Sequence, residues 1–235
     1  MIPLHDDLQA ERRPYVTWLL VVVNVLFFLH ELSLEGALNG FLQTHGLVSA
    51  RVMDPEVWRD FDWERQTGPL LTHMFLHGGW LHLIGNMWML ILFGDNVEGR
   101  LGHGNFLFFY IASGLGAAAA QVASDTGSFV PMVGASGAIG GVLGAYMVLF
   151  PFARVLTVIP ILIFIQVVRV PAIVFIGFWA LLQFFQGTAE LHRGATAGVA
   201  FWAHLGGFGV GAVWILINPA LRRARARSTR RIASR

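Results

Sequence analysis

The chain has 235 residues, of which 55% are hydrophobic and 13% are charged, and its formal net charge is +2. Soluble domains usually carry about a quarter charged residues, so this composition leaves too little polar material for a water-facing surface and excludes a soluble globular protein. The absence of cysteine excludes disulfide bonds and thiolate metal sites. Long apolar stretches separated by short polar ones predict an all-α membrane protein with several membrane-spanning helices.

Six apolar segments predict six spans, and they cover residues 15–29, 80–93, 105–124, 135–152, 171–186 and 198–217. The second segment can extend upstream through residues 70–76. Several segments are shorter than the about 20 residues that a bilayer requires, so we expect tilting, local thinning or neighbours that cover the helix ends. A signal peptide is the alternative for the first segment, because Arg12 and Arg13 precede it, but no small-residue cleavage motif follows closely.

Two connections between the segments are unusual. Residues 30–69 form a long loop with seven acidic residues and two tryptophans, which indicates an interfacial insertion on the outer side. Residues 153–170 are apolar, contain Pro160, and are flanked by Arg154 and Arg169. This pattern favours a hairpin or an interfacial segment on the inner face over a seventh span.

The distribution of arginine predicts the orientation of the chain, because cytoplasmic loops carry an excess of basic residues. With six spans and a cytoplasmic N-terminus, most arginines face inward, including the seven after residue 221. We therefore expect a cytoplasmic tail over residues 1–14, a membrane domain over 15–218 and an Arg-rich cytoplasmic tail over 219–235. The expected location is a bacterial plasma membrane. The Arg-rich tail follows a hydrophobic helix, so its expected partners are membrane lipids and not nucleic acid.

Ionisable and strongly polar residues are costly inside a membrane and are candidates for function by default. Three of the predicted spans carry such residues: His73, His77, His82 and Asn86 in the second, Ser136 in the fourth, and His204 in the sixth. In the predicted topology these three spans all run inward from the outer face. His82, Ser136 and His204 lie near the start of their spans, so we expect them at a similar shallow depth.

Small residues recur every four positions beside Ser136 and His204, from Gly137 to Gly144 and from Ala203 to Gly211. Such stripes let two helix backbones approach closely in lipid, which would bring the hydroxyl to the imidazole. A serine hydroxyl becomes a useful nucleophile when a neutral histidine takes its proton. The predicted span interiors hold no Asp or Glu, so we expect a Ser–His dyad whose imidazole is oriented by something other than a carboxylate.

At these residues the chain resembles the rhomboid family of intramembrane serine proteases, over about residues 15–218. The matching features are the histidine cluster with Asn86, GASG around Ser136, AHLGGFGVG around His204, and EGRLGHGNFLFFYIASG at residues 98–114. The resemblance implies a six-transmembrane-helix rhomboid-like bundle. It also implies a serine endopeptidase that cleaves single-span transmembrane proteins and uses no metal or other cofactor.

The resemblance further assigns roles to individual residues. Ser136 would be the nucleophile and His204 the general base, while His82, Asn86 and the Ser136 backbone N–H would stabilise the oxyanion. The fifth helix, here 171–186, and the loop at 187–197 would gate substrate entry. Some members stack a tyrosine on the catalytic histidine, but here Gly140 takes that position. What orients His204 therefore stays open.

A second departure is Gly68-Pro69, which replaces a Trp-Arg pair often found before the histidine cluster. The roles of His73 and His77 also stay open, with a structural or loop-anchoring role favoured.

Three other functions compete with this interpretation. A metal site could use His73, His77 and His82, but no acidic or thiol ligand is predicted in the spans, and GASG would be unexplained. A transporter could use polar residues at mid-depth, yet the polar residues here cluster near one face, and no internal repeat is visible. A non-catalytic rhomboid-like protein acting in binding or quality control is the strongest alternative, although such relatives typically lack the serine or the histidine.

Overall fold

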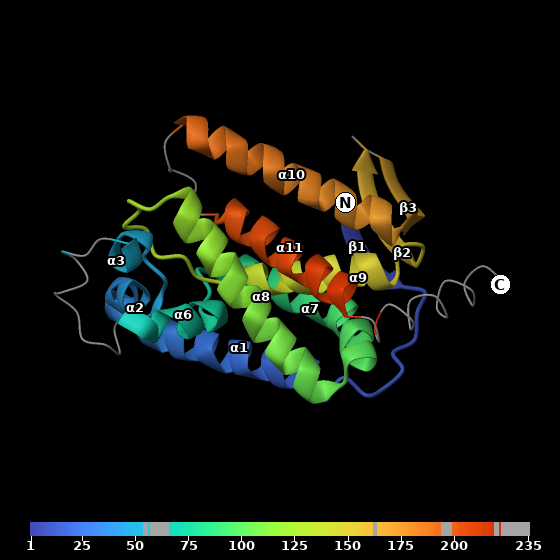
Figure 1. Ribbon diagram of the computed structural model, residues 1–235, viewed down its shortest axis with the longest axis horizontal. Helices are drawn as coiled ribbons and strands as arrows, with labels where there is room; N and C mark the ends of the chain where they lie inside the picture. The colour runs from blue at the N-terminus through green and yellow to red at the C-terminus, as the bar shows by residue number, and fades with distance from the viewer. Residues whose placement is uncertain (54–55, 57–65, 162–163, 194–198, 219–220, 222–235) are drawn as a thin grey trace.

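A computed structural model of the protein describes residues 1–53, 56, 66–161, 164–193, 199–218 and 221 (Figure 1). Six helices follow the six predicted apolar segments: α1 (Tyr15–Ser33), α7 (Trp80–Leu101), α8 (His103–Ser124), α9 (Ser136–Leu149), α10 (Ala172–Arg193) and α11 (Phe201–Ile217). The predicted helical membrane bundle is therefore confirmed. The two tryptophans of the long loop and the arginines after residue 221 lie outside the described residues.

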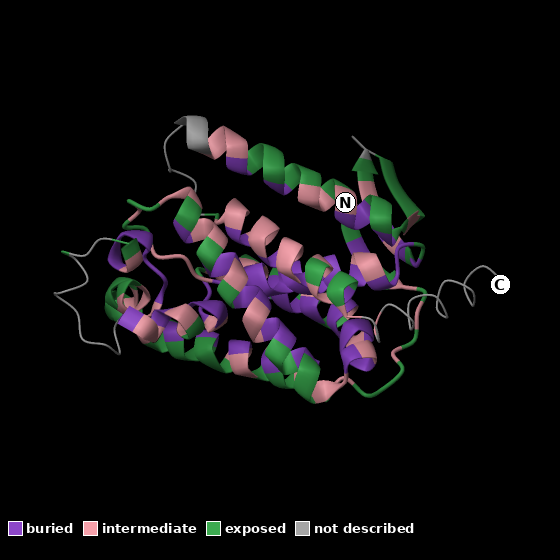
Figure 2. Ribbon diagram, viewed as in Figure 1, coloured by how far each residue is buried: buried purple, intermediate pink, exposed green. Residues whose placement is uncertain are grey.

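The helices differ both in length and in how far they are buried. Helices α1, α8 and α10 are each long and apolar enough to cross a membrane. Helix α7 forms a bent pair, at 91°, with the upstream segment Pro69–Phe75, which consists of α6 (Pro69–Thr72) and η2 (His73–Phe75). Helix α9 has only 14 residues, about 21 Å, but nearly all of its side chains are buried among other helices (Figure 2). Neighbouring helices therefore cover α9, as its short length predicts.

Helices α9 and α11 touch through their backbones along the predicted stripes of small residues. A Cβ atom on Gly207 would overlap the carbonyl oxygen of Gly137, and one on Gly211 would overlap that of Gly141. Glycine at these positions removes the side chain that would hold the helices apart, so the two backbones approach as closely as the stripes predict.

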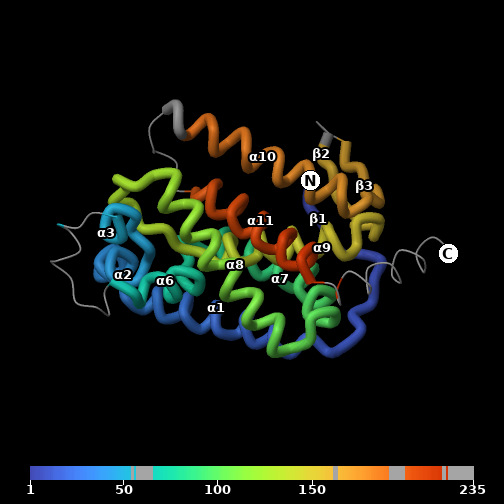
Figure 3. Tube along the Cα trace, viewed as in Figure 1, coloured from blue at the N-terminus to red at the C-terminus, as the bar shows by residue number. Residues whose placement is uncertain are grey.

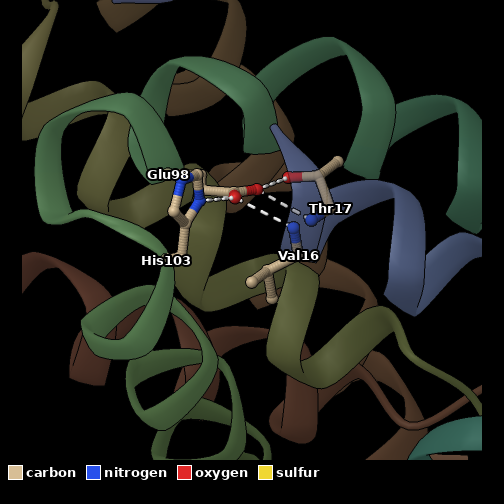
Figure 4. Close-up of polar contacts among 4 residues, drawn as sticks. All are labelled: Val16, Thr17, Glu98 and His103. Carbon is tan, nitrogen blue, oxygen red and sulfur yellow. Dashed lines mark hydrogen bonds and ion pairs between the residues drawn. The ribbon is translucent and has the colours of Figure 1, made fainter. Parts of the chain in front are cut away.

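A buried carboxylate joins three helices at the far end of α7 (Figure 4). Glu98 is 0% exposed and accepts hydrogen bonds from the backbone N–H groups of Val16 and Thr17, at 2.9 and 2.7 Å, and from the Thr17 hydroxyl at 2.7 Å. His103 Nδ1 lies 2.5 Å from the same carboxylate. Because the first N–H groups of a helix have no partner within the helix, Glu98 satisfies the start of α1 and ties it to α7 and α8.

A small antiparallel sheet is the exception to the expected all-α fold. Its strands are β1 (Ile2–Asp6), β2 (Arg154–Ile161) and β3 (Phe164–Pro171), in the order β1-β2-β3. Strands β2 and β3 form the hairpin that the sequence predicts within residues 153–170. Strand β1 was not predicted, because it lies in the segment assigned to the N-terminal tail. It pairs with β2, with Ile2 opposite Val158.

The sheet and the long loop lie at opposite ends of the bundle, as the trace in Figure 3 shows. The loop forms η1 (Glu35–Ala37), α2 (Leu38–His45) and α3 (Ser49–Met53), which lie beside α6. Thr72 of α6 donates a hydrogen bond to the His45 carbonyl at 2.6 Å, and Leu47 pairs with Met132 just before α9. We call the end of the bundle that carries η1, α2 and α3 the loop end, and the end that carries β1, β2 and β3 the sheet end. The loop end also holds the starts of α7, α9 and α11.

Candidate active site

Ser136 is the first residue of α9, and a short, constrained turn presents it. The preceding Gly134 has φ +125°, in a region that residues with a side chain rarely adopt. The Gly134 N–H donates to the His73 carbonyl at 2.8 Å, which fixes the turn to the segment before α7. The Ser136 hydroxyl therefore sits at a helix N-terminus, where backbone N–H groups are not used by the helix itself.

His204, in the first turn of α11, meets Ser136 directly. Its Nε2 lies 2.8 Å from Ser136 Oγ, which is hydrogen-bonding distance. The close α9–α11 contact brings the two residues together, because a Cβ atom on Gly140 would lie 2.6 Å from the His204 carbonyl oxygen. The pair that the sequence predicts from two separate helices is thus joined by one hydrogen bond.

The opposite edge of the His204 ring contacts helix α10. Nδ1 of His204 lies 2.6 Å from Oε1 of Gln183, and the ring centroid of Trp179 lies 6.1 Å from that of His204. Neither α10 residue was singled out from the sequence. The available signal was a polar side chain within the apolar segment predicted as the fifth span, since polar residues inside a membrane often have a functional role.

His82 lies beside Ser136. A Cβ atom on Gly134 would be 2.6 Å from His82 Nε2 and 3.5 Å from Ser136 Oγ, so the imidazole and the hydroxyl approach the same point on the backbone. Asn86 follows one turn later on α7 and is buried, with its Nδ2 2.9 Å from Nε2 of His77. The site residues predicted from the sequence therefore all lie at one cavity: Ser136, His204, His82 and Asn86.

His73 and His77 have their own structural partners. His73 Nδ1 lies 2.7 Å from the Pro69 carbonyl oxygen. The backbone N–H of His77 donates to both carboxylate oxygens of Glu31, at 3.0 and 3.2 Å. Within the described part of the chain, no three His, Asp or Glu side chains group so that they could hold a metal ion.

Glu31 is a buried acidic residue near the end of α1. The sequence assigns it to the outer loop, but α1 extends to Ser33 and buries Glu31 to 1% exposure. The carboxylate contacts the segment that leads into α7 and not the His204 ring, whose Nδ1 is bonded to Gln183. His204 therefore contacts the Ser136 hydroxyl through Nε2 and an amide oxygen, not a carboxylate, through Nδ1.

A cavity of about 930 Å³ opens onto these residues. Ser136, His204, His82 and Asn86 line its polar part, and apolar side chains line much of the rest: Met89, Leu143, Phe175 and Trp179. The cavity runs between α7 and α10 and reaches Pro3 of β1 and the preceding Met1. A few polar side chains therefore lie together in a mainly apolar cavity, which is the usual make-up of a binding site.

Comparison with known proteins gives a consistent result. The model of the Rhomboid domain family matches residues 55–219. The chain is 35% identical to "Rhomboid protease GluP" of Bacillus subtilis over 136 residues, which cover 57% of this chain and 24% of that protein. It is 38% identical to "RHOMBOID-like protein 5" of Arabidopsis thaliana over 78 residues, 33% of this chain and 25% of the relative.

A yeast protein matches a longer part of the chain. The chain is 30% identical to "Rhomboid protein 1, mitochondrial" of Saccharomyces cerevisiae over 163 residues, which cover 67% of this chain and 44% of the relative. In all three relatives the chain spans less than half of the other protein's length.

Proposed function

Because the chain belongs to the rhomboid family, we propose that it is an intramembrane serine endopeptidase that cleaves transmembrane proteins through a dyad of Ser136 and His204. The observation that carries this proposal is the 2.8 Å contact between Ser136 Oγ and His204 Nε2 inside a largely apolar cavity. A hydroxyl and an imidazole in this geometry can act as nucleophile and general base.

In the first half of the reaction, Ser136 Oγ attacks the carbonyl carbon of the scissile peptide while His204 Nε2 takes the hydroxyl proton. The tetrahedral intermediate collapses when the imidazolium gives that proton to the leaving amine, which leaves an acyl group on Ser136. In the second half, His204 takes a proton from a water molecule that attacks the acyl carbon. The Ser136–acyl bond breaks, and the proton returns to Ser136 Oγ.

The negative oxygen of each tetrahedral intermediate needs donors that are already in position. The proposed donors are the His82 imidazole, the Asn86 amide and the Ser136 backbone N–H. An asparagine amide carries two hydrogens, and the hydrogen bond with His77 uses one of them, so the second remains for the oxyanion. The His77 contact would hold the Asn86 amide in the orientation that this role requires.

The proposed substrates are single-span membrane proteins, and the proposed location is a bacterial plasma membrane with both chain ends in the cytoplasm. The mainly apolar lining of the cavity between α7 and α10 supports a substrate segment that comes from lipid. In this orientation the loop end faces outward, and cleavage occurs close to the outer surface.

The test is cleavage of a model single-span substrate by the full chain, purified in detergent without added metal. We expect Ser136→Ala and His204→Ala each to reduce cleavage by at least about 1,000-fold, because the two groups act as a unit. The same wild-type protein should be labelled by a fluorophosphonate probe, and Ser136→Ala should not.

Ser113→Ala is the matched control. Ser113 is a buried serine on α8 whose hydroxyl has no hydrogen-bond partner among the described residues, so its removal should leave cleavage and labelling unchanged. Cleavage that a chelator abolishes, or that survives in Ser136→Ala, would contradict the proposal. A folded wild-type protein that neither cleaves nor labels would favour the non-catalytic alternative.

A further inference from the structure

Gln183 is the side chain that contacts Nδ1 of His204, on the opposite side of the ring from Ser136. Its side chain lies on α10, is 9% exposed, and brings Oε1 to 2.6 Å from His204 Nδ1. The residues on either side, Leu182 and Phe184, are exposed at the surface of the bundle. Gln183 is thus the side chain in this turn that points inward, toward the imidazole.

The chemistry of the dyad requires one tautomer of His204. Nε2 must keep its lone pair in order to accept the Ser136 proton, so Nδ1 must carry the hydrogen. A carbonyl oxygen 2.6 Å from Nδ1 accepts that hydrogen and disfavours the other tautomer, which would set two lone pairs against each other. The bond also strengthens when His204 becomes charged, because hydrogen bonds from a charged donor are stronger.

We infer that Gln183 is a positioning residue that fixes the tautomer and ring orientation of His204 and stabilises its protonated form. This inference rests on the proposed peptidase function. It assigns to a neutral amide the role that a carboxylate has in a serine triad. An amide is suited to this place, because an uncompensated carboxylate between membrane helices carries a large desolvation cost.

The two side chains that contact the far side of the His204 ring come from a third helix, α10. Ser136 and His204 lie on α9 and α11, whereas Gln183 and Trp179 both approach the imidazole from α10. Helix α10 lies at the edge of the bundle above α11 (Figure 1). A movement that takes α10 away from α11 would therefore remove the orienting contacts without separating α9 from α11.

The experiment compares three variants of the full chain in detergent: Gln183→Met, Gln183→Glu and Gln186→Met. Methionine keeps the length of the side chain but removes the strong acceptor, and glutamate keeps an acceptor oxygen. Gln186 is exposed on the same helix and serves as the control for the Gln-to-Met change itself. The readouts are kcat and KM for a single-span substrate, the rate of fluorophosphonate labelling, and the thermal unfolding midpoint.

We expect Gln183→Met to lower kcat/KM by about 10- to 100-fold, the loss of one hydrogen bond to a group that becomes charged. The loss should fall mainly on kcat, and labelling should slow to a similar degree. Gln183→Glu should recover most of the activity per folded molecule, because a carboxyl group keeps an acceptor oxygen in either protonation state, and Gln186→Met should match the wild type.

Two results would overturn the inference. One is a Gln183→Met protein that cleaves and labels at the wild-type rate. The other is an equal loss in Gln183→Met and Gln183→Glu, since a role in packing alone predicts no rescue by an acceptor. Failure of the proposed function would look different. In that case the probe would not label the wild-type protein, or it would label Ser136→Ala.

Discussion

Gly140 lets the His204 backbone approach α9 at the level of the dyad. A Cβ atom there would lie 2.6 Å from the His204 carbonyl oxygen and 3.4 Å from the Phe208 backbone nitrogen. Some rhomboid proteases have a tyrosine at this position. In this chain the backbones of α9 and α11 lie too close together to leave room for its side chain. The orienting contact must therefore come from another direction, and Gln183 reaches His204 from α10.

We expect Gly140→Ala to separate α9 from α11 by a few tenths of an ångström and to lengthen the contact between Ser136 and His204. Overpacking of this kind costs about 1–3 kcal/mol of stability. The rate of fluorophosphonate labelling should fall at least about tenfold, because a small misplacement of reacting groups is expensive. The measurement is labelling kinetics together with the thermal unfolding midpoint.

Gly209→Ala is the control, because no atom of the described residues lies within 4 Å of a Cβ at that position of α11. It should label at the wild-type rate. Equal labelling by Gly140→Ala and Gly209→Ala would show that the close approach at Gly140 has no part in the reaction.

The sequence singled out Ser136, His204, His82 and Asn86, which line one cavity, but it missed two buried side chains near them, for a physical reason in each case. Glu31 was placed in a loop because the apolar run ends near Leu29. Its burial could have been found from the stripe Thr17, Leu20, Asn24, Phe28 and Glu31, whose spacing of three and four residues marks one face of a helix. The contact of Gln183 with His204 depends on how α10 packs on α11, and no local pattern encodes that.

At the scale of elements, β1 links the sheet to the helix bundle. The Trp88 indole N–H of α7 donates to the Pro3 carbonyl at 2.7 Å. The Asp6 carboxylate accepts hydrogen bonds from the Tyr146 hydroxyl of α9 and from the Asn96 amide of α7. Strand β1 thus joins α7 and α9 to the hairpin that leads directly into α10.

The docking of β1 should depend on pH through Asp6. Burial raises the pKa of the Asp6 carboxyl above its ordinary value, and the hydrogen bond from Tyr146 offsets part of this effect. Because the docked state binds the proton more tightly, the contribution of Asp6 to docking is full below the ordinary pKa of a free aspartate. This contribution is lost as the pH rises through the raised pKa.

We therefore expect the β1 amides to lose protection from hydrogen exchange as the pH rises from below the ordinary pKa of an aspartate through the raised pKa of Asp6, after correction for intrinsic exchange rates. Asp6→Asn keeps a side chain of the same size without the titrating group, so its protection should vary less over this range. An equal change of protection in the wild type and in Asp6→Asn would rule Asp6 out as the cause.

Most of the helical elements could be predicted from hydropathy, while strand β1 could not. Each helix has a local signal, a run of apolar residues, that survives in any packing arrangement. The hairpin at 153–170 also has one, since its two arms are rich in the β-branched residues valine and isoleucine. Strand β1 has only five residues, and its partner β2 lies about 150 positions later in the chain, so its structure depends on a contact that local patterns do not contain.

At the scale of the whole molecule, the Ser136–His204 pair and the helix junction around Glu98 lie far apart. Glu98 follows His82 by sixteen positions on α7, which is about 24 Å along a helix. The loop end carries Ser136 and His204, whereas α1 begins and α7 ends on the side of the sheet (Figure 1), where Glu98 joins α1, α7 and α8 (Figure 4). Stability and chemistry should therefore respond to different substitutions.

Glu98→Gln tests this separation. The amide keeps the size of the side chain, but it replaces one acceptor oxygen with a donor that would face the N–H and hydroxyl donors of α1. We expect a loss of about 2–4 kcal/mol in the free energy of unfolding, because hydrogen bonds to a buried charge are lost and donors are left unsatisfied. In the Glu98→Gln molecules that remain folded, the fluorophosphonate probe should still label Ser136 at the wild-type rate.

Glu11→Gln is the control for the loss of a carboxylate at a helix junction. Glu11 is about half exposed and pairs with Arg100 at 3.3 Å, so its replacement should change the unfolding free energy by less than about 1 kcal/mol. Thermal or denaturant unfolding in detergent measures both variants, and labelling normalised to folded protein measures the dyad. If Glu98→Gln slowed labelling without lowering stability, Glu98 would have to act on the dyad across the length of α7, and the two ends of the bundle would not be independent.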